Sequence, residues 1–118
     1  MSIERLTGSA VGRNRAVSFD NLIFTVATAG APSAGLAEQT RLTLSQLDKN
    51  LADAGSDKSR ILSATVYITD ISKKAEMDAV WNPWIGPDNW PQRACIGVAL
   101  AKGDLVEITI VATKSPNA

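Results

Sequence analysis

Two charged side chains lie inside otherwise apolar stretches near the C-terminus, and they are the first candidates for chemistry. Arg93 opens the run from 93 to 100, and Glu107 lies within the run from 105 to 112. An arginine offers a planar pair of donors that fits a carboxylate, and a glutamate can exchange a proton with water. The alternative is a solvated pair on the sheet surface, where such charges cost little free energy.

Cys95 lies two residues after Arg93, so strand alternation places both side chains on one face. A neighbouring cation lowers the pKa of a thiol, which would activate Cys95. Cysteine is more often a small buried residue, however, and the chain has no histidine to act as its base, so we expect a packing role. Whether Glu107 joins this face depends on the strand register, since a one-residue slip turns a side chain to the opposite face.

Composition excludes several other classes of site. The 118 residues carry twelve Lys and Arg against twelve Asp and Glu, with no histidine and a pI near 6.2. This balance lacks the basic excess that favours nucleic acid, so binding of nucleic acid is not expected. The missing histidine removes the commonest metal ligand, and Cys95 alone cannot form a disulfide within the chain or a thiolate cluster. We therefore expect no metal and no cofactor.

Length and hydropathy predict one domain over residues 1–118 that stays out of the membrane. A chain of this size buries about two thirds of the surface that its unfolded form exposes, and two domains would not fit comfortably. The N-terminus lacks the apolar core of a signal peptide, and no stretch approaches the roughly 18 apolar residues of a membrane span. A cytoplasmic location is the expectation.

The first half of the chain predicts two strands and a helix. The short run 16–19, the turn pair Asp20-Asn21 and the apolar run 22–27 are typical of strands joined by a tight turn. Apolar residues recur every three or four positions over 36–54, which predicts an amphipathic helix with Gly55 as its left-handed cap. The apolar stripe consists of Leu44, Leu47, Leu51 and Ala54, and the residues expected mostly elsewhere around the helix are Gln39, Arg41, Gln46, Lys49 and Asn50.

The second half predicts a strand, a helix and a hairpin. Residues 60–69 are rich in β-branched types and indicate a half-buried strand with Leu62, Ala64, Val66 and Ile68 on one face. Ser72 can cap a second helix, and Pro83 should kink or end it near Asn82. The runs 93–100 and 105–112, joined by a turn at 102–104, predict a β-hairpin.

Together these elements predict an α+β sandwich of order β-β-α-β-α-β-β, with two helices sharing one sheet face. Trp81 and Trp84 are expected to pack in the core or at an interface rather than to stack on a ligand. With Trp90, they provide apolar area that one thin sandwich cannot readily bury, which favours an oligomer.

Several stretches match a known family in order and spacing. The strongest is Pro-Gln-Arg-Ala-Cys-Ile-Gly-Val-Ala-Leu at 91–100, followed by Val-Glu-Ile at 106–108. Supporting stretches are Gln39-Thr40, 51–55, 64–70 and 78–81. Over nearly its whole length the chain resembles the RidA (YjgF/YER057c/UK114) family, whose members have a P-x-R-[S/A/C]-C strand and a closing V/I-E-I strand.

The resemblance implies a chorismate-mutase-like α+β fold with a mixed sheet, and a homotrimer with ligand clefts between adjacent subunits. It also implies hydrolysis of reactive enamine and imine intermediates, such as 2-aminoacrylate, to 2-oxo acids and ammonia. Arg93 matches the arginine that binds the substrate carboxylate, and Glu107 matches the acidic residue that holds the hydrolytic water. Cys95, with Ala94 beside it, matches the position whose backbone contacts the ligand.

The chain also departs from the family pattern. Members often carry a tyrosine near the start, where this chain offers Arg13 or Asn14, and Val26-Ala27 stands at the substrate-binding position where typical members read Ser-Gly. The Trp81 to Trp84 segment resembles a divergent branch. A rival hypothesis is a non-catalytic trimer that binds metabolites, or acts as a chaperone, through the same cleft. An RNA-cleaving role has no support from a neutral chain without histidine.

Overall fold

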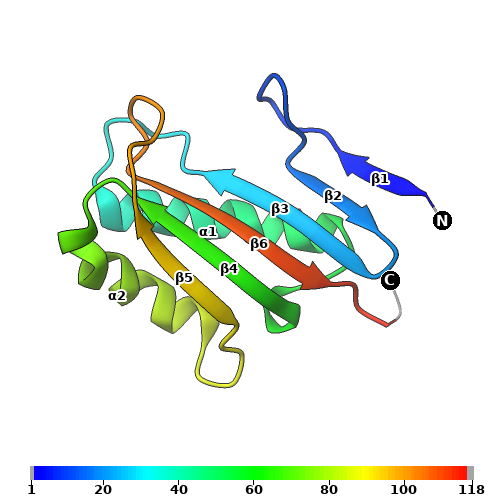
Figure 1. Ribbon diagram of the computed structural model, residues 1–118. Helices are drawn as coiled ribbons and strands as arrows, with labels where there is room; N and C mark the ends of the chain where they lie inside the picture. The colour runs from blue at the N-terminus through cyan, green and yellow to red at the C-terminus, as the bar shows by residue number, and fades with distance from the viewer. Residues whose placement is uncertain (1, 117–118) are drawn as a thin grey trace.

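A mixed six-stranded sheet carries both helices on one of its faces in the computed structural model, which describes residues 2–116 (Figure 1). The strands are β1 (Ile3–Leu6), β2 (Ala16–Phe19), β3 (Leu22–Thr28), β4 (Ile61–Ile68), β5 (Gln92–Gly97) and β6 (Val106–Thr113). The helices are α1 (Leu36–Asp53) and α2 (Lys74–Ile85), and short 3-10 turns precede β4 and α2. The predicted α+β class, with two helices on one face of a mixed sheet, is confirmed.

The sheet order is β1-β2-β3-β6-β4-β5, with β4 and β5 parallel and every other neighbouring pair antiparallel. Sequence patterning missed β1, because this edge strand is mostly exposed and has no apolar alternation. The predicted hairpin of 93–100 with 105–112 is wrong, because β4 lies between β5 and β6. The chain returns from β4 through α2 to a parallel β5, and residues 98–105 then pass to the far side of β4.

Apolar alternation on the three central strands builds the core against the helices. Inward-facing residues of β3, β4 and β6 meet one stripe of each helix, and each large side chain that is fully buried contributes roughly 1.5–3 kcal/mol. The core includes Ile23, Val66, Ile68, Val106, Ile108, Leu44, Leu47, Leu51, Met77, Trp81 and Ile85. Leu62, predicted on the buried face, is instead 50% exposed, because a register shift between Ile61 and Ser63 turns Ile61 inward.

The helix ends are partly as predicted. Gly55 adopts φ +88° after α1, and the N–H groups of Gly55 and Ser56 bond to the carbonyls of Ala52 and Leu51, which is a Schellman cap. Asp70 caps the 3-10 turn before α2, since its carboxylate accepts from the Ser72 N–H, whereas α2 itself begins after Lys73 without a side-chain cap, so the predicted cap by Ser72 is wrong. The predicted end near Asn82 does not occur: the helix runs through Pro83 to Ile85, because proline removes only its own N–H and the Gly86 N–H still bonds the Asn82 carbonyl.

Gln39 joins two loops at one end of the sheet. Its side chain is fully buried, although the helical pattern placed it away from the apolar stripe. Its amide N–H groups donate to the carbonyls of Ala31, Ala34 and Gly103, and its carbonyl accepts from the Leu105 N–H at 2.9 Å. The loop before α1 and the loop before β6 are therefore held together. Within residues 2–116, no helix is long and apolar enough to cross a membrane.

Replacing Gly103 by alanine tests this loop contact. A Cβ on Gly103, at φ +91°, would lie 2.6 Å from the Pro32 Cβ, whereas a Cβ on Gly30, at φ +65°, meets nothing within 4 Å. Both substitutions carry the strain of a positive φ, but only Gly103→Ala adds a clash. We expect it to lower the free energy of unfolding by roughly 1–3 kcal/mol more than Gly30→Ala does, measured by urea denaturation. Equal losses would contradict the contact.

Candidate active site

The sheet divides the predicted site residues between its two faces. Arg93 and Cys95 pair in register with the buried Ala64 and Val66, so both side chains face the helices. Glu107 pairs with Tyr67 and lies on the opposite, open face. Residues paired in register share a face of the sheet. The register therefore places Arg93 and Cys95 on one face and Glu107 on the other, and the three side chains do not converge. Within one protomer, Arg93 and Glu107 therefore do not meet.

Glu107 has a cationic partner on the open face. Nη1 of Arg13 donates to its carboxylate at 3.1 Å, and Arg13 comes from the loop between β1 and β2. Of the two residues considered in place of the tyrosine, Arg13 is thus the one that contacts Glu107. Thr28 pairs with Glu107 in register, and Val26 follows on the same face. The charged pair lies beside the end of β3.

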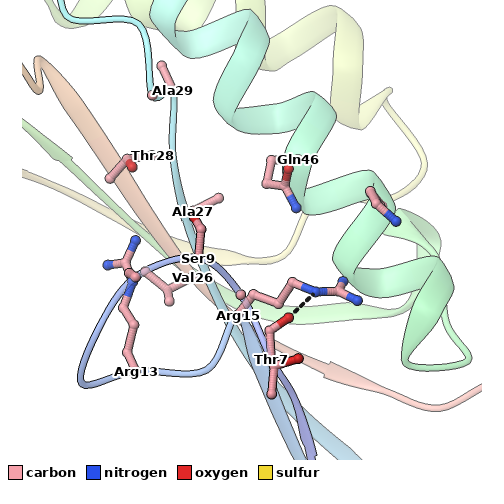
Figure 2. Close-up of a pocket in the computed structure, with 13 residues that line it drawn as sticks. Thr7, Ser9, Arg13, Arg15, Val26, Ala27, Thr28, Ala29 and Gln46 are labelled. Atoms are coloured by element: carbon pink, nitrogen blue, oxygen red, sulfur yellow. Dashed lines mark hydrogen bonds between the residues drawn. The ribbon is translucent and has the colours of Figure 1, made fainter.

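A cavity of about 350 Å³ opens next to this pair (Figure 2). The loop of residues 7–15, the end of β3 and α1 enclose it, and Figure 2 shows Arg13 on the loop and Gln46 on α1, with β3 between them. Val26 and Ala27 both line the cavity, although the Ala27 side chain packs into the core and is only 3% exposed. The two residues predicted from the Ser-Gly position therefore lie at this cavity, without a hydroxyl.

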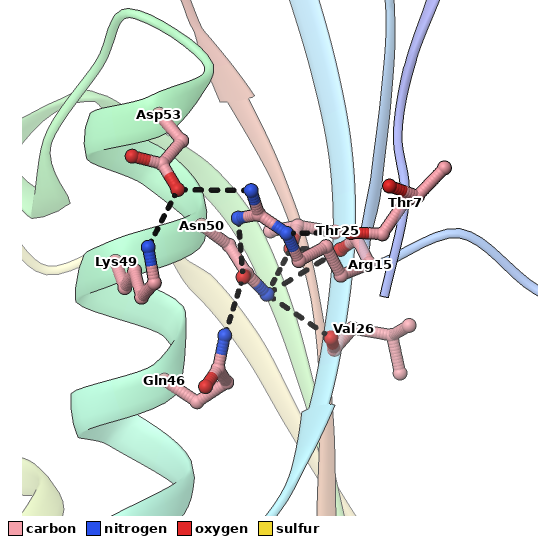
Figure 3. A network of polar contacts seen from close by, with 8 residues as sticks. All are labelled: Thr7, Arg15, Thr25, Val26, Gln46, Lys49, Asn50 and Asp53. Carbon is pink, nitrogen blue, oxygen red and sulfur yellow. Dashed lines mark hydrogen bonds and ion pairs between the residues drawn. The ribbon is translucent and has the colours of Figure 1, made fainter. Parts of the chain in front are cut away.

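A buried polar network supports the cavity from α1 (Figure 3). The Arg15 guanidinium donates to the Thr7 carbonyl and to Asn50, and forms an ion pair with Asp53 at 2.9 Å. The amide of Asn50 donates to the Thr25 hydroxyl at 3.0 Å and to the Val26 carbonyl at 3.3 Å. Loop, strand and helix are thereby tied together. Asn50 is fully buried, contrary to its predicted place away from the apolar stripe.

Arg93 belongs to a second group, at the free edge of the sheet. Its Nη1 bonds Asp78 of α2 at 2.8 Å, and its guanidinium lies 5.2 Å from the ring centre of Trp81. These residues line a groove that also includes the exposed Trp90. Burial by itself would raise the pKa of Asp78, but hydrogen bonds from Lys74 and Arg93 outweigh it and lower this pKa below its ordinary value. The pair is therefore ionised at neutral pH and orients Arg93.

The backbone of β5 is available at the same edge. Val98 donates its N–H to the Ile68 carbonyl of β4, and successive residues of a strand direct their backbone groups to opposite sides. Arg93 and Cys95 therefore direct their N–H and C=O groups away from β4, off the edge of the sheet. Ala94 directs its backbone toward β4, while its side chain lies on the open face beside Thr65.

The surroundings of the Cys95 thiol disfavour its ionised form. Burial raises its pKa above the ordinary value, and the opposing effects of the Arg93 and Lys74 cations are smaller. The side chain packs at the margin of the core. This geometry agrees with a packing side chain whose backbone, rather than its sulfur, is open to a ligand.

Comparison with known proteins decides the family. The model of the family described as Endoribonuclease L-PSP matches residues 7–114. The chain belongs to the YjgF (RidA) family. A solved structure of a YjgF family member from Neisseria meningitidis is 38% identical to it and has a TM-score of 0.88, with 98% of this chain and 97% of that chain covered.

Two relatives of this YjgF-family chain extend the comparison. A RutC family protein of Haemophilus ducreyi is 46% identical over 76 residues, 64% of this chain and 65% of the relative. The match thus spans just under two thirds of that protein's length. A human protein named 2-iminobutanoate/2-iminopropanoate deaminase is 32% identical over 85 residues, 71% of this chain and 61% of that protein.

Asp78→Asn tests the ion pair with Arg93. The pKa of Asp78 is lowered in the folded chain, so its ionised form stabilises the fold above the ordinary aspartate pKa, near 3.9. That stabilisation disappears as the pH falls through the lower, folded pKa. The free energy of unfolding of the wild type should fall below about pH 4, and that of the variant should fall less, because the variant has no Asp78 carboxylate to protonate. Urea denaturation between pH 7 and pH 3 measures this, with Asp88→Asn as the exposed control. A decline unchanged from wild type would contradict the pair.

Alkylation tests the state of Cys95. Because the raised pKa leaves little thiolate at neutral pH, iodoacetamide at pH 7.5 should modify the folded protein about tenfold more slowly than free cysteine. Denatured protein is the control and should react at the rate of free cysteine. A folded-state rate that matches or exceeds that of free cysteine would indicate an activated thiol.

Proposed function

We propose that this chain hydrolyses reactive 2-imino acids to 2-oxo acids and ammonia, in clefts between the subunits of a homotrimer. The observation that carries the proposal is the division of the site. Glu107 lies on the open face and binds Arg13, which lines the cavity, and Arg93 lies on the free edge strand β5. Family membership and the human relative named as an imine deaminase support the same reaction.

The open face gives a physical reason for assembly. Within residues 2–116 no element covers this face, and Leu22, Phe24 and Ile96 on it are between 40% and 48% exposed. The tryptophans are a weaker reason than the sequence suggested, because Trp81 on α2 is buried in the core and, of the three, only Trp90 is largely exposed. Closed cyclic assemblies join two different surfaces of neighbouring copies. Such an interface can bring the β5 edge of one copy to the open face of the next.

The reaction needs orientation and a water-derived proton more than a strong nucleophile. Arg93 of one copy would hold the carboxylate of the 2-imino acid through the guanidinium donors that Asp78 leaves free. Glu107 of the adjacent copy would take a proton from water as the oxygen bonds to the imine carbon. The same carboxyl would return that proton to nitrogen, which gives the carbinolamine. It would then carry the hydroxyl proton to nitrogen as the carbonyl forms and the carbon–nitrogen bond breaks. The products are a 2-oxo acid and ammonia, and the backbone of Cys95 would orient the nitrogen.

A non-catalytic trimer that binds metabolites remains the second candidate. It is favoured by Val26 and Ala27, which offer the cavity no hydroxyl where typical family members carry serine. The two functions differ in one observable. A binding protein would bind 2-oxo acids without accelerating hydrolysis of any 2-imino acid.

Substitution of Arg93 is the central test. An amino-acid oxidase generates the 2-imino acid, and semicarbazide trapping follows its loss. Arg93→Ala should lower kcat/KM by about 100-fold or more, since the carboxylate loses its oriented partner, and Arg93→Lys should restore part of it. Arg41→Ala, which removes an exposed helix arginine, is the matched control. Sedimentation must find the wild-type trimer in each variant, and an unchanged rate for Arg93→Ala would reject this role.

Glu107→Gln tests the proton transfer separately. The substitution preserves shape and removes the base, so kcat should fall by about 100-fold while KM changes little. If the kcat of Glu107→Gln equals the wild-type kcat at every pH from 6 to 9, Glu107 is not the proton carrier.

A further inference from the structure

Three cations line the cavity beside Glu107, and no aspartate or glutamate among residues 2–116 lines it. The cations are Arg13, Arg15 and Lys49, and the other polar side chains at the wall are the hydroxyls of Thr7, Ser9 and Thr28 and the amide of Gln46. A volume of about 350 Å³ lies in the range of small-molecule pockets. This wall is suited to an anionic group, and it is separate from the guanidinium of Arg93 in the same protomer.

The contacts distinguish Arg13 from the other two cations. Arg15 is occupied by Thr7, Asn50 and Asp53, and Lys49 is paired with Asp53 at 3.0 Å. In the part of the chain that the structure describes, the Arg13 side chain has one hydrogen-bond partner, Glu107, which Nη1 binds, and the side chain is 40% exposed. Its guanidinium therefore keeps donors on Nε and Nη2 for a second acceptor. A carboxylate could bind there while the Glu107 pair stays in place.

The loop that carries Arg13 is held in position before any ligand arrives. Two residues later, the Arg15 N–H bonds the Leu6 carbonyl at 3.0 Å, and its side chain binds Thr7 and the α1 network (Figure 3). Little conformational freedom of the backbone is then lost when a ligand binds, which favours selective recognition. Val26 and Ala27 offer no side-chain hydrogen bond at this wall.

We propose that Arg13 binds a second carboxylate of the substrate, so that the cleft prefers dicarboxylic 2-imino acids over those with an apolar side chain. The inference rests on the proposed function for the reaction, although the preference itself concerns binding. Arg93 of one copy would take the carboxylate next to the imine. Arg13 of the adjacent copy would take the distal one, beside Glu107.

Product analogues test the preference without catalysis. 2-Oxoglutarate and 2-oxopentanoate have chains of equal length and differ by the distal carboxylate. Calorimetric titration of the wild-type protein should give at least tenfold tighter binding of 2-oxoglutarate. Arg13→Gln should weaken that binding at least tenfold and weaken 2-oxopentanoate by less than threefold, and Arg41→Gln is the control. Sedimentation checks the assembly of each variant.

The outcomes separate the two proposals. Three outcomes would overturn the role of Arg13. The wild type could bind 2-oxoglutarate and 2-oxopentanoate with equal affinity, Arg13→Gln could keep the preference for 2-oxoglutarate, or Arg13→Gln could weaken the binding of both ligands equally. The corresponding 2-imino acids, generated by oxidases, are assayed in parallel. Hydrolysis of both 2-imino acids at equal kcat/KM would support the proposed deaminase activity and contradict the preference for dicarboxylic substrates. Selective binding of 2-oxoglutarate that depends on Arg13, with no hydrolysis of either imine, would keep the preference and reject the deaminase.

Discussion

The position of β4 between β5 and β6 is the constraint on which the site depends. It makes β5 an edge strand and sets the register that turns Arg93 toward the helices and Glu107 toward the open face. A side chain cannot pass through a hydrogen-bonded sheet, so one chain keeps the two proposed half-sites, around Arg93 and around Glu107, apart. Any chemistry that uses both must take one half from each of two copies, which links the proposed reaction to assembly.

Ion pairs orient the arginine of each half-site. Asp78 holds Arg93 by one nitrogen over the Trp81 ring, and Glu107 holds Arg13 by one nitrogen at the cavity. In both cases the guanidinium retains donors for a ligand. An arginine that is already oriented loses less side-chain entropy on binding than a free one. The neutral net charge of the chain therefore conceals local sites that favour anions.

Buried amides support this arrangement from α1. Gln39 joins the loops near Gly103, and Asn50 joins β3 to the loop that carries Arg13. Each side chain satisfies backbone groups that would otherwise be buried without partners, at a cost of about 1–3 kcal/mol per group. The helix thus does more than cover the sheet, because its polar residues determine where these two loops lie.

Local pattern in the sequence was enough to determine the helices, the central strands, the Gly55 cap and, through the spacing around Arg93 and Glu107, the family. These features depend on apolar periodicity and backbone preference, which act over a few residues. The edge strand β1, the bulge that exposes Leu62, the burial of Gln39 and Asn50, and the separation of β5 from β6 required the tertiary structure. So did the pairing of Arg13 with Glu107, which are 94 positions apart. Strand order and register depend on contacts between distant segments, and alternation within one strand is the same whichever neighbour it has.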